Sequence, residues 1–113
     1  MLRKAEALLL EGVYEARDEV KNLVRMLEIH LEYVEESDVE QRAAILRRIA
    51  ELRDERLSDD EGAFEALGLL VPLLPEDEGL RERYSEVGRR LDKHRDVVDV
   101  LTRAAEAAQP KLV

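Results

Sequence analysis

The side chains with the greatest chemical range in this sequence are its two histidines, which both lie among carboxylates. His30 is flanked by Glu28 and Glu32, but residues two apart on a helix do not face each other. The Glu-x-x-His spacing of helical di-metal sites is also absent, because a leucine stands three residues before His30 and before His94. Zinc sites need three or four converging ligands. We therefore expect both histidines to serve packing or solvation, with no metal bound.

Covalent chemistry would need a nucleophile beside a base, and the sequence pattern predicts none. Ser37, Ser58 and Ser85 are interpreted as helix caps or small packing residues. The glycines are scattered singly, so they do not form a phosphate-binding loop. With 27 acidic residues, close carboxylate pairs arise by chance, and without a buried cleft they lack the shifted pKa values that catalysis uses. We expect a protein without catalytic activity or cofactor.

Composition narrows the possible partners and compartments. The 113 residues include 27 acidic and 18 basic side chains, a formal net charge of −9, which disfavours binding to nucleic acid or to anionic membranes. The longest apolar runs, at residues 7–10 and 69–74, are too short to span a bilayer. There is no cysteine, which excludes disulfides and fits a cytoplasmic location. A hydrophobic content of 45% indicates a folded chain.

The elements that would position these residues are helices, most clearly at residues 44–75. The first half of this stretch has apolar residues at helical spacing, namely Ile45, Leu46, Ile49, Leu52 and Leu57. The second half has a much wider apolar surface, formed by Ala63, Phe64, Ala66, Leu67, Leu70, Val71 and Leu74. A helix that is apolar over so wide an arc must be covered on more than one side, which is typical of stacked helical hairpins.

Local signals predict where these helices begin and bend. Ser37 with Glu40, and Ser58 with Glu61, match the capping-box pattern of a helix N-terminus. Pro72 is expected to kink the second helix, because proline has no N–H and crowds the carbonyl four residues earlier. We therefore predict two helices that each begin at a serine, with a bend near the end of the second.

The side chains of this central hairpin follow a known order of large and small residues. They are Leu46, Ile49 and Ala50 on the first helix, and Ala63, Leu67 and Pro75 on the second. In this order they resemble a tetratricopeptide repeat, a hairpin of two antiparallel helices in about 34 residues. Arg53 stands where that family usually has an aromatic residue, and the DERLSDD turn is one residue longer than the family spacing.

The flanking segments repeat the pattern, which predicts three units at about residues 1–35, 39–75 and 76–109. The resemblance implies an all-α superhelix of three stacked hairpins, with six helices in a single domain. The first helix has apolar residues at Leu2, Leu9, Leu10, Val13 and Tyr14. The sixth, expected after a turn at residues 92–94, has Val98, Val100 and Ala105 outside its main stripe. We interpret this surface as the contact for a further repeat in a longer solenoid, or for a second chain.

The same resemblance implies a function. In tetratricopeptide repeats the first helix of each hairpin lines a concave groove, which binds a peptide or helix of another protein. The matching positions here are Leu8, Gly12, Glu15, Arg47, Glu51, Asp54, Glu82, Glu86 and Arg89. This set has more carboxylates than guanidinium groups, which favours a cationic or mixed partner. We therefore predict a non-catalytic scaffold for protein–protein interaction.

Two alternatives to a binding groove stay open at this point. The charged residues on the first helices can simply keep those helices soluble through pairs three or four residues apart. The chain can also be a structural homo-oligomer that assembles through the apolar terminal helices, the first and the sixth.

Overall fold

A computed structural model describes residues 2–108 of the chain. Its elements are α1 (Lys4–Ala16), α2 (Val20–Tyr33), α3 (Val39–Glu55), α4 (Asp60–Leu70), the short 3-10 helix η1 (Val71–Leu73), α5 (Glu78–Arg90) and α6 (His94–Ala108). No β-strand occurs between residues 2 and 108. The all-α prediction and the six α-helices are confirmed. Positions 1 and 109, the predicted ends of the first and third units, lie outside the described residues.

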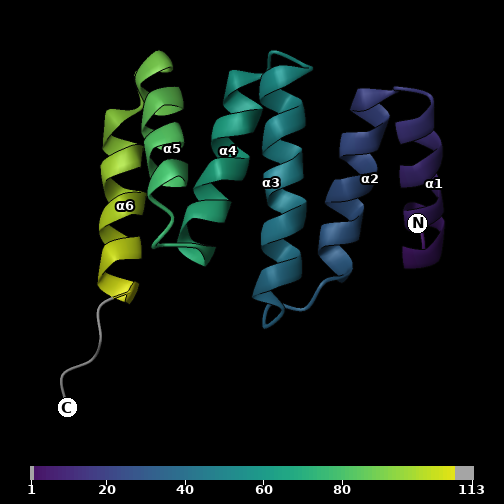
Figure 1. Ribbon diagram of the computed structural model, residues 1–113, viewed down its shortest axis with the longest axis horizontal. Helices are drawn as coiled ribbons and strands as arrows, with labels where there is room; N and C mark the ends of the chain where they lie inside the picture. The colour runs from purple at the N-terminus through teal and green to yellow at the C-terminus, as the bar shows by residue number, and fades with distance from the viewer. Residues whose placement is uncertain (1, 109–113) are drawn as a thin grey trace.

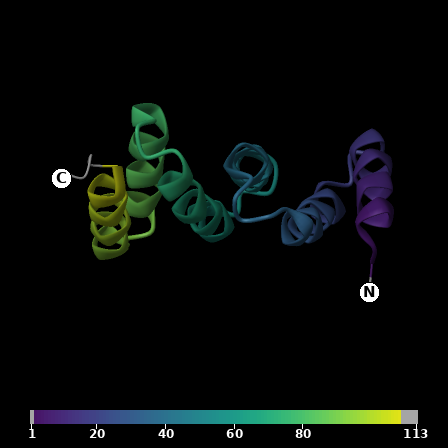
Figure 2. The same ribbon diagram turned by 90° about the horizontal axis from the view of Figure 1, so that it is seen from below.

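Consecutive helices run antiparallel and lie side by side in chain order, so that α1/α2, α3/α4 and α5/α6 form three hairpins (Figure 1). The molecule is a slab with extents of 47, 36 and 22 Å. Figure 2 shows α1, α3 and α5 displaced to one side of the slab, and α2, α4 and α6 to the other. We call these sides the first-helix face and the second-helix face.

The turn inside each hairpin contains one residue in the left-handed region, Asp18 at φ 56°, Ser58 at φ 50° and Asp92 at φ 56°. Such residues end helices because the left-handed conformation returns backbone N–H groups to the last carbonyls of the helix. In the first and third turns a backbone N–H donates a hydrogen bond to the carbonyl five residues earlier. In the second turn an N–H donates to the carbonyl six residues earlier. The predicted extra residue in the second turn is accommodated in this wider loop.

Aspartates rather than serines cap three of the helices, so both capping-box predictions are wrong by one residue. The carboxylates of Asp38, Asp59 and Asp77 accept hydrogen bonds from the backbone N–H groups three residues later, at 3.2, 2.9 and 3.1 Å. Ser58 cannot cap α4, because its left-handed backbone belongs to the preceding turn. A carboxylate is also the stronger acceptor beside the positive end of a helix dipole.

Two further boundaries differ from the sequence prediction. Pro72 does not bend a continuing helix: α4 ends at Leu70, and Pro72 lies within the separate 3-10 turn η1. The missing proline N–H therefore falls where the α-helical hydrogen-bond ladder has already ended. Helix α6 begins at His94, inside the turn that was predicted at residues 92–94.

One core cluster runs through the stack from α2 to α6, and a closely packed part of it lies where the second hairpin meets the third. Ala63, Leu70 and Val71 have no exposed surface, and Tyr84 of α5 is only 2% exposed. Gly88 permits the close approach of α5 and α6, because a Cβ at that position would collide with Val97 of α6 and lie 3.1 Å from the Phe64 ring. This tight packing fixes the relative position of α4, α5 and α6.

Candidate functional site

The nine predicted groove residues all lie on α1, α3 and α5, the helices of the first-helix face. Glu51 and Asp54 are half-buried, and the others are exposed: Leu8, Gly12, Glu15, Arg47, Glu82, Glu86 and Arg89. The structure therefore places the nine positions on the three helices of the first-helix face. Whether they bind a partner stays a prediction.

Several of these charges are engaged within the chain. Glu15 of α1 pairs with Arg48 of α3. Asp54 of α3 pairs with Arg83 of α5 at 2.9 Å and lies 3.5 Å from Arg90. These pairs join one hairpin to the next, and exposed pairs of this kind contribute at most about 1 kcal/mol each. Their carboxylates are therefore less available to an outside cation than the sequence indicated.

Arg47 of α3 is also engaged, and it couples to the cap of α5. Its guanidinium lies 3.2 Å from the Asp77 carboxylate. The Leu80 N–H bonded to that carboxylate, together with Arg47, lowers the pKa of Asp77. Both residues line a small pocket of about 220 Å³ between α3, α4 and α5. This end of the first-helix face is a joint between hairpins.

Arg53 has a clear structural role in place of the aromatic residue of the repeat pattern. One arm of its guanidinium donates to the Gly62 carbonyl at 3.1 Å, and the other to the Glu28 carboxylate at 2.7 Å. Arg53 therefore ties α2, α3 and α4 together. A planar side chain with five donors can do this, whereas an aromatic ring can only pack.

The two histidines occupy different settings. His30 Nδ1 lies 2.9 Å from the Glu11 carboxylate, and Nε2 lies 3.4 Å from the side-chain nitrogen of Gln41. The imidazole thus lies between α1 and α3, and the partner carboxylate is neither of its neighbours in sequence. Within residues 2–108 no three His, Asp or Glu side chains are placed to hold a metal ion.

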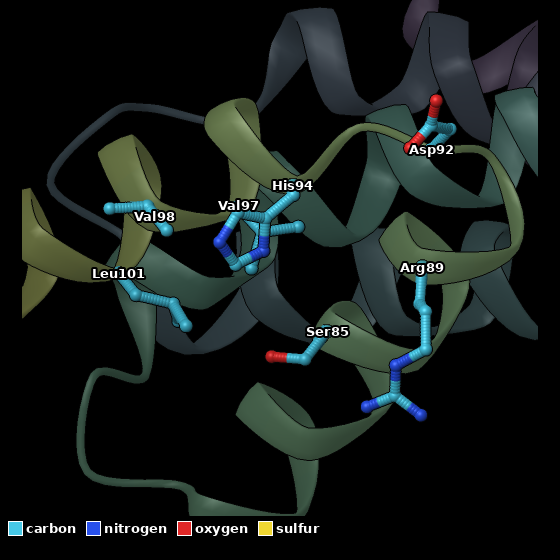
Figure 3. Close-up of a pocket in the computed structure, with 7 residues that line it drawn as sticks. All are labelled: Ser85, Arg89, Asp92, His94, Val97, Val98 and Leu101. Carbon is cyan, nitrogen blue, oxygen red and sulfur yellow. The ribbon is translucent and has the colours of Figure 1, made fainter.

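His94 lines a pocket of about 340 Å³ between α5 and α6, together with Arg89, Asp92 and Leu101 (Figure 3). Ser85 also lines it, but its hydroxyl donates to the Arg81 carbonyl at 3.0 Å. In Figure 3 the Arg89 guanidinium points away from the His94 ring. These groups are not aligned as a nucleophile and its base, which must lie within hydrogen-bond reach.

A larger hollow among the described residues lies on the second-helix face, between α4, η1 and α6, and we call it the α4–α6 groove. Its volume is about 640 Å³. The apolar lining is formed by Phe64, Gly68, Leu69, Pro72, Tyr84, Val100, Ala104 and Ala107, and the polar residues are Glu65 and Arg103. Leu69 is 56% exposed and extends the apolar lining of the groove to the surface.

Tyr84 supplies an unpaired polar group to this groove. Its side chain is almost wholly buried, yet its hydroxyl makes no hydrogen bond to any residue that the structure describes. Gly68 leaves room beside it, since a Cβ there would lie 3.3 Å from the hydroxyl oxygen. The hydroxyl is not among the fully buried unpaired side-chain atoms, so it stays accessible from the groove. An acceptor that entered the groove would provide one.

A second, smaller hollow adjoins the groove between α2, α3 and α4. It has a volume of about 220 Å³ and shares Glu65 and Leu69 with the α4–α6 groove. Leu69 is therefore a ridge between the two. Glu32 and Glu65 are exposed at the edges, and neither forms an ion pair with another residue in the range 2–108. Sequence reasoning missed this site, although the wide apolar surface of α4 was a signal for it.

No helix among the described residues is long and apolar enough to cross a membrane. Comparison with models of known protein families found no match, and neither did comparison with curated proteins or with solved structures.

Proposed function

We propose that this chain is a non-catalytic module for protein–protein interaction, and that it binds an amphipathic helix of a partner protein. The observation that carries the proposal is the α4–α6 groove, an apolar hollow of about 640 Å³ in a highly charged chain. Docking of an apolar helix face into a groove between helices is a common mode of peptide recognition.

The exposed Leu69 ridge and the unpaired Tyr84 hydroxyl support a specific mode of binding for such a helix. One large apolar side chain enters the groove beside Leu69, and its removal from water supplies most of the affinity. The Tyr84 hydroxyl donates to an acceptor on the incoming helix. The groove walls come from three packed helices, so binding does not have to order the scaffold, which preserves affinity.

The charges at the edge favour a basic partner. Glu32 and Glu65 are carboxylates without an ion-pair partner among the described residues, whereas Arg103 is the basic residue of the groove. The net charge of −9 adds long-range attraction for a cationic helix. We therefore expect lysine or arginine beside the apolar anchor, on the side that faces α2.

The architecture behind this surface is, in our proposal, a stack similar to tetratricopeptide repeats. Support comes from the antiparallel hairpins, the separation of first and second helices onto two faces, and the recurring left-handed turn residue. The prediction that the first-helix face binds a peptide remains open beside the groove proposed here. We place the module in the cytoplasm because it has no cysteine.

A selection from displayed helical peptides tests the proposal. Wild-type protein should enrich helices with large apolar residues three or four apart and adjacent lysine or arginine. The same selection on Glu65→Lys should shift the enriched charges from basic toward acidic. If the enriched peptides have no apolar anchor, or if their charges are the same for both baits, the α4–α6 groove is not the binding site.

A pair of counter-variants separates the two faces. Peptides enriched on the wild type should lose binding to Leu69→Asp and keep it for the double variant Glu51→Lys/Glu86→Lys. The opposite result would move the site to the first-helix face, as the sequence resemblance implied.

A further inference from the structure

The exposed side of α1 carries an apolar strip that has no cover within the described chain. The strip consists of Ala5, Leu8, Leu9, Gly12 and Ala16, which recur at the three- and four-residue spacing of one helix side. Leu9 is 71% exposed and Leu8 is 41% exposed. A Cβ added to Gly12 would meet nothing within 4 Å. Leu9, which the sequence groups with the apolar residues of this helix, is therefore on the outside.

We propose that this strip is the contact with a second copy of the chain, in which the two α1 helices pack antiparallel about a two-fold axis close to Leu9. The strip is self-complementary in shape under that symmetry. Leu8 of one copy meets Gly12 of the other, and Ala5 meets Ala16. The first pair places a large side chain against a glycine, and the second pair is small on both sides, which allows close packing of the two helices.

Charge complementarity favours a second copy of the chain as the partner of this strip, and it requires the two α1 helices to run antiparallel. Lys4 and Glu15 are eleven positions apart in the sequence, about three helical turns, so they lie on the same flank of α1. In an antiparallel pair, Lys4 of each copy lies beside Glu15 of the other. In a parallel pair Lys4 of one copy and Glu15 of the other would be about three helical turns apart and could not pair.

Lys4 can form this contact directly, whereas Glu15 has to share its carboxylate with Arg48 of its own chain. Lys4 is exposed and forms no ion pair with another residue in the described range. The Glu15 side chain is 57% exposed even while it is paired with Arg48. A single pair of thirteen-residue helices buries less than the roughly 1,200 Å² at the lower end of standard interfaces. The dimer should therefore be weak and reversible.

Sedimentation of three variants over a concentration series tests the contact. Wild type should dimerise, and Lys4→Glu should raise the dissociation constant by roughly tenfold or more through like-charge contacts. The double variant Lys4→Glu/Glu15→Lys should restore it to within about threefold, since the pair is exchanged and not removed. A wild type that stays monomeric, or a double variant as weak as the single, overturns the proposal. So does a dimer that Val98→Glu on α6 dissociates while Lys4→Glu leaves it intact.

Disulfide trapping tests the direction, because the natural chain has no cysteine. Leu9→Cys should form a covalent dimer readily under mild oxidation, since Leu9 lies close to the two-fold axis. Ala5→Cys should not, whereas Ala5→Cys/Ala16→Cys should. Efficient cross-linking of Ala5→Cys alone would mean a parallel pair and overturn the proposal. These outcomes are independent of peptide binding in the α4–α6 groove.

Discussion

The ring of Phe64 on α4 stacks on the ring of Tyr84 on α5, with centroids 4.7 Å apart and 14° between the planes. The Lys93 ammonium also lies over the Phe64 ring, 5.4 Å from its centroid. Both rings are buried, so the stack joins the second hairpin to the third. The Tyr84 hydroxyl reaches the α4–α6 groove. One residue therefore both holds two hairpins together and supplies a polar group to the groove.

Tyr84→Phe separates these two roles. The stack is kept, so the melting temperature should stay within a few degrees of wild type. Affinity for a helix selected on the wild type should fall roughly fivefold, because a net hydrogen bond contributes about 1 kcal/mol. Calorimetric titration measures the affinity. Unchanged binding would show that the hydroxyl does not contact the partner.

Stability should also decline at high pH because of Tyr84. Burial, and to a lesser degree the charge of Asp96, raises the pKa of Tyr84 in the folded protein. The folded state then holds this proton more tightly than the unfolded state does. Stability is fully present below the unfolded pKa, about 10, and is lost as the pH rises through the folded pKa. Urea melts between pH 9 and 11 should show a smaller decline for Tyr84→Phe. Equal declines would place the titration elsewhere.

Two glycine-to-alanine substitutions should change the stability of the fold in opposite directions. Gly88→Ala introduces a Cβ that collides with Val97 and crowds Phe64, and should destabilise the fold by about 1–3 kcal/mol. Gly12→Ala meets no neighbour, so the better helix propensity of alanine should stabilise by about 0.5–1 kcal/mol. Denaturant melts at low protein concentration measure both. A neutral Gly88→Ala would contradict the close approach of α5 and α6.

The aspartate caps lead to a similar contrast. Asp59→Ala should destabilise by about 1 kcal/mol, because the hydrogen bond to the Gly62 N–H is lost. Ser58→Gly should instead stabilise slightly, since glycine adopts a positive φ without steric cost. If Ser58→Gly is as destabilising as Asp59→Ala, the serine is a cap after all.

Helical periodicity was sufficient to predict the hairpins, because the helices place apolar residues three or four positions apart. Ala63 and Leu67, placed by the repeat pattern at the helix crossing, are 0% and 2% exposed. The caps were harder, because Ser58 and Asp59 both match the local pattern and only the left-handed backbone of Ser58 decides between them.

The groove could not be predicted in the same way. Leu69, Tyr84 and Val100 lie on three different helices, and they line one hollow only because of how the second and third hairpins pack. Local spacing likewise cannot predict a pair such as His30 with Glu11, because the two residues lie on different helices. Leu9 shows the reverse case: its spacing fits the apolar stripe of α1, but no helix of the described chain covers it.

The most direct test of the interaction proposal is the affinity of one selected basic amphipathic helix for three proteins, measured by calorimetric titration. Leu69→Asp should weaken binding by roughly tenfold or more, because a carboxylate then stands on the ridge where the apolar anchor is buried. Leu9→Asp is the matched control, since it introduces the same charge at an exposed leucine of α1, and it should bind like the wild type. Equal affinity for Leu69→Asp and the wild type would contradict binding in the α4–α6 groove.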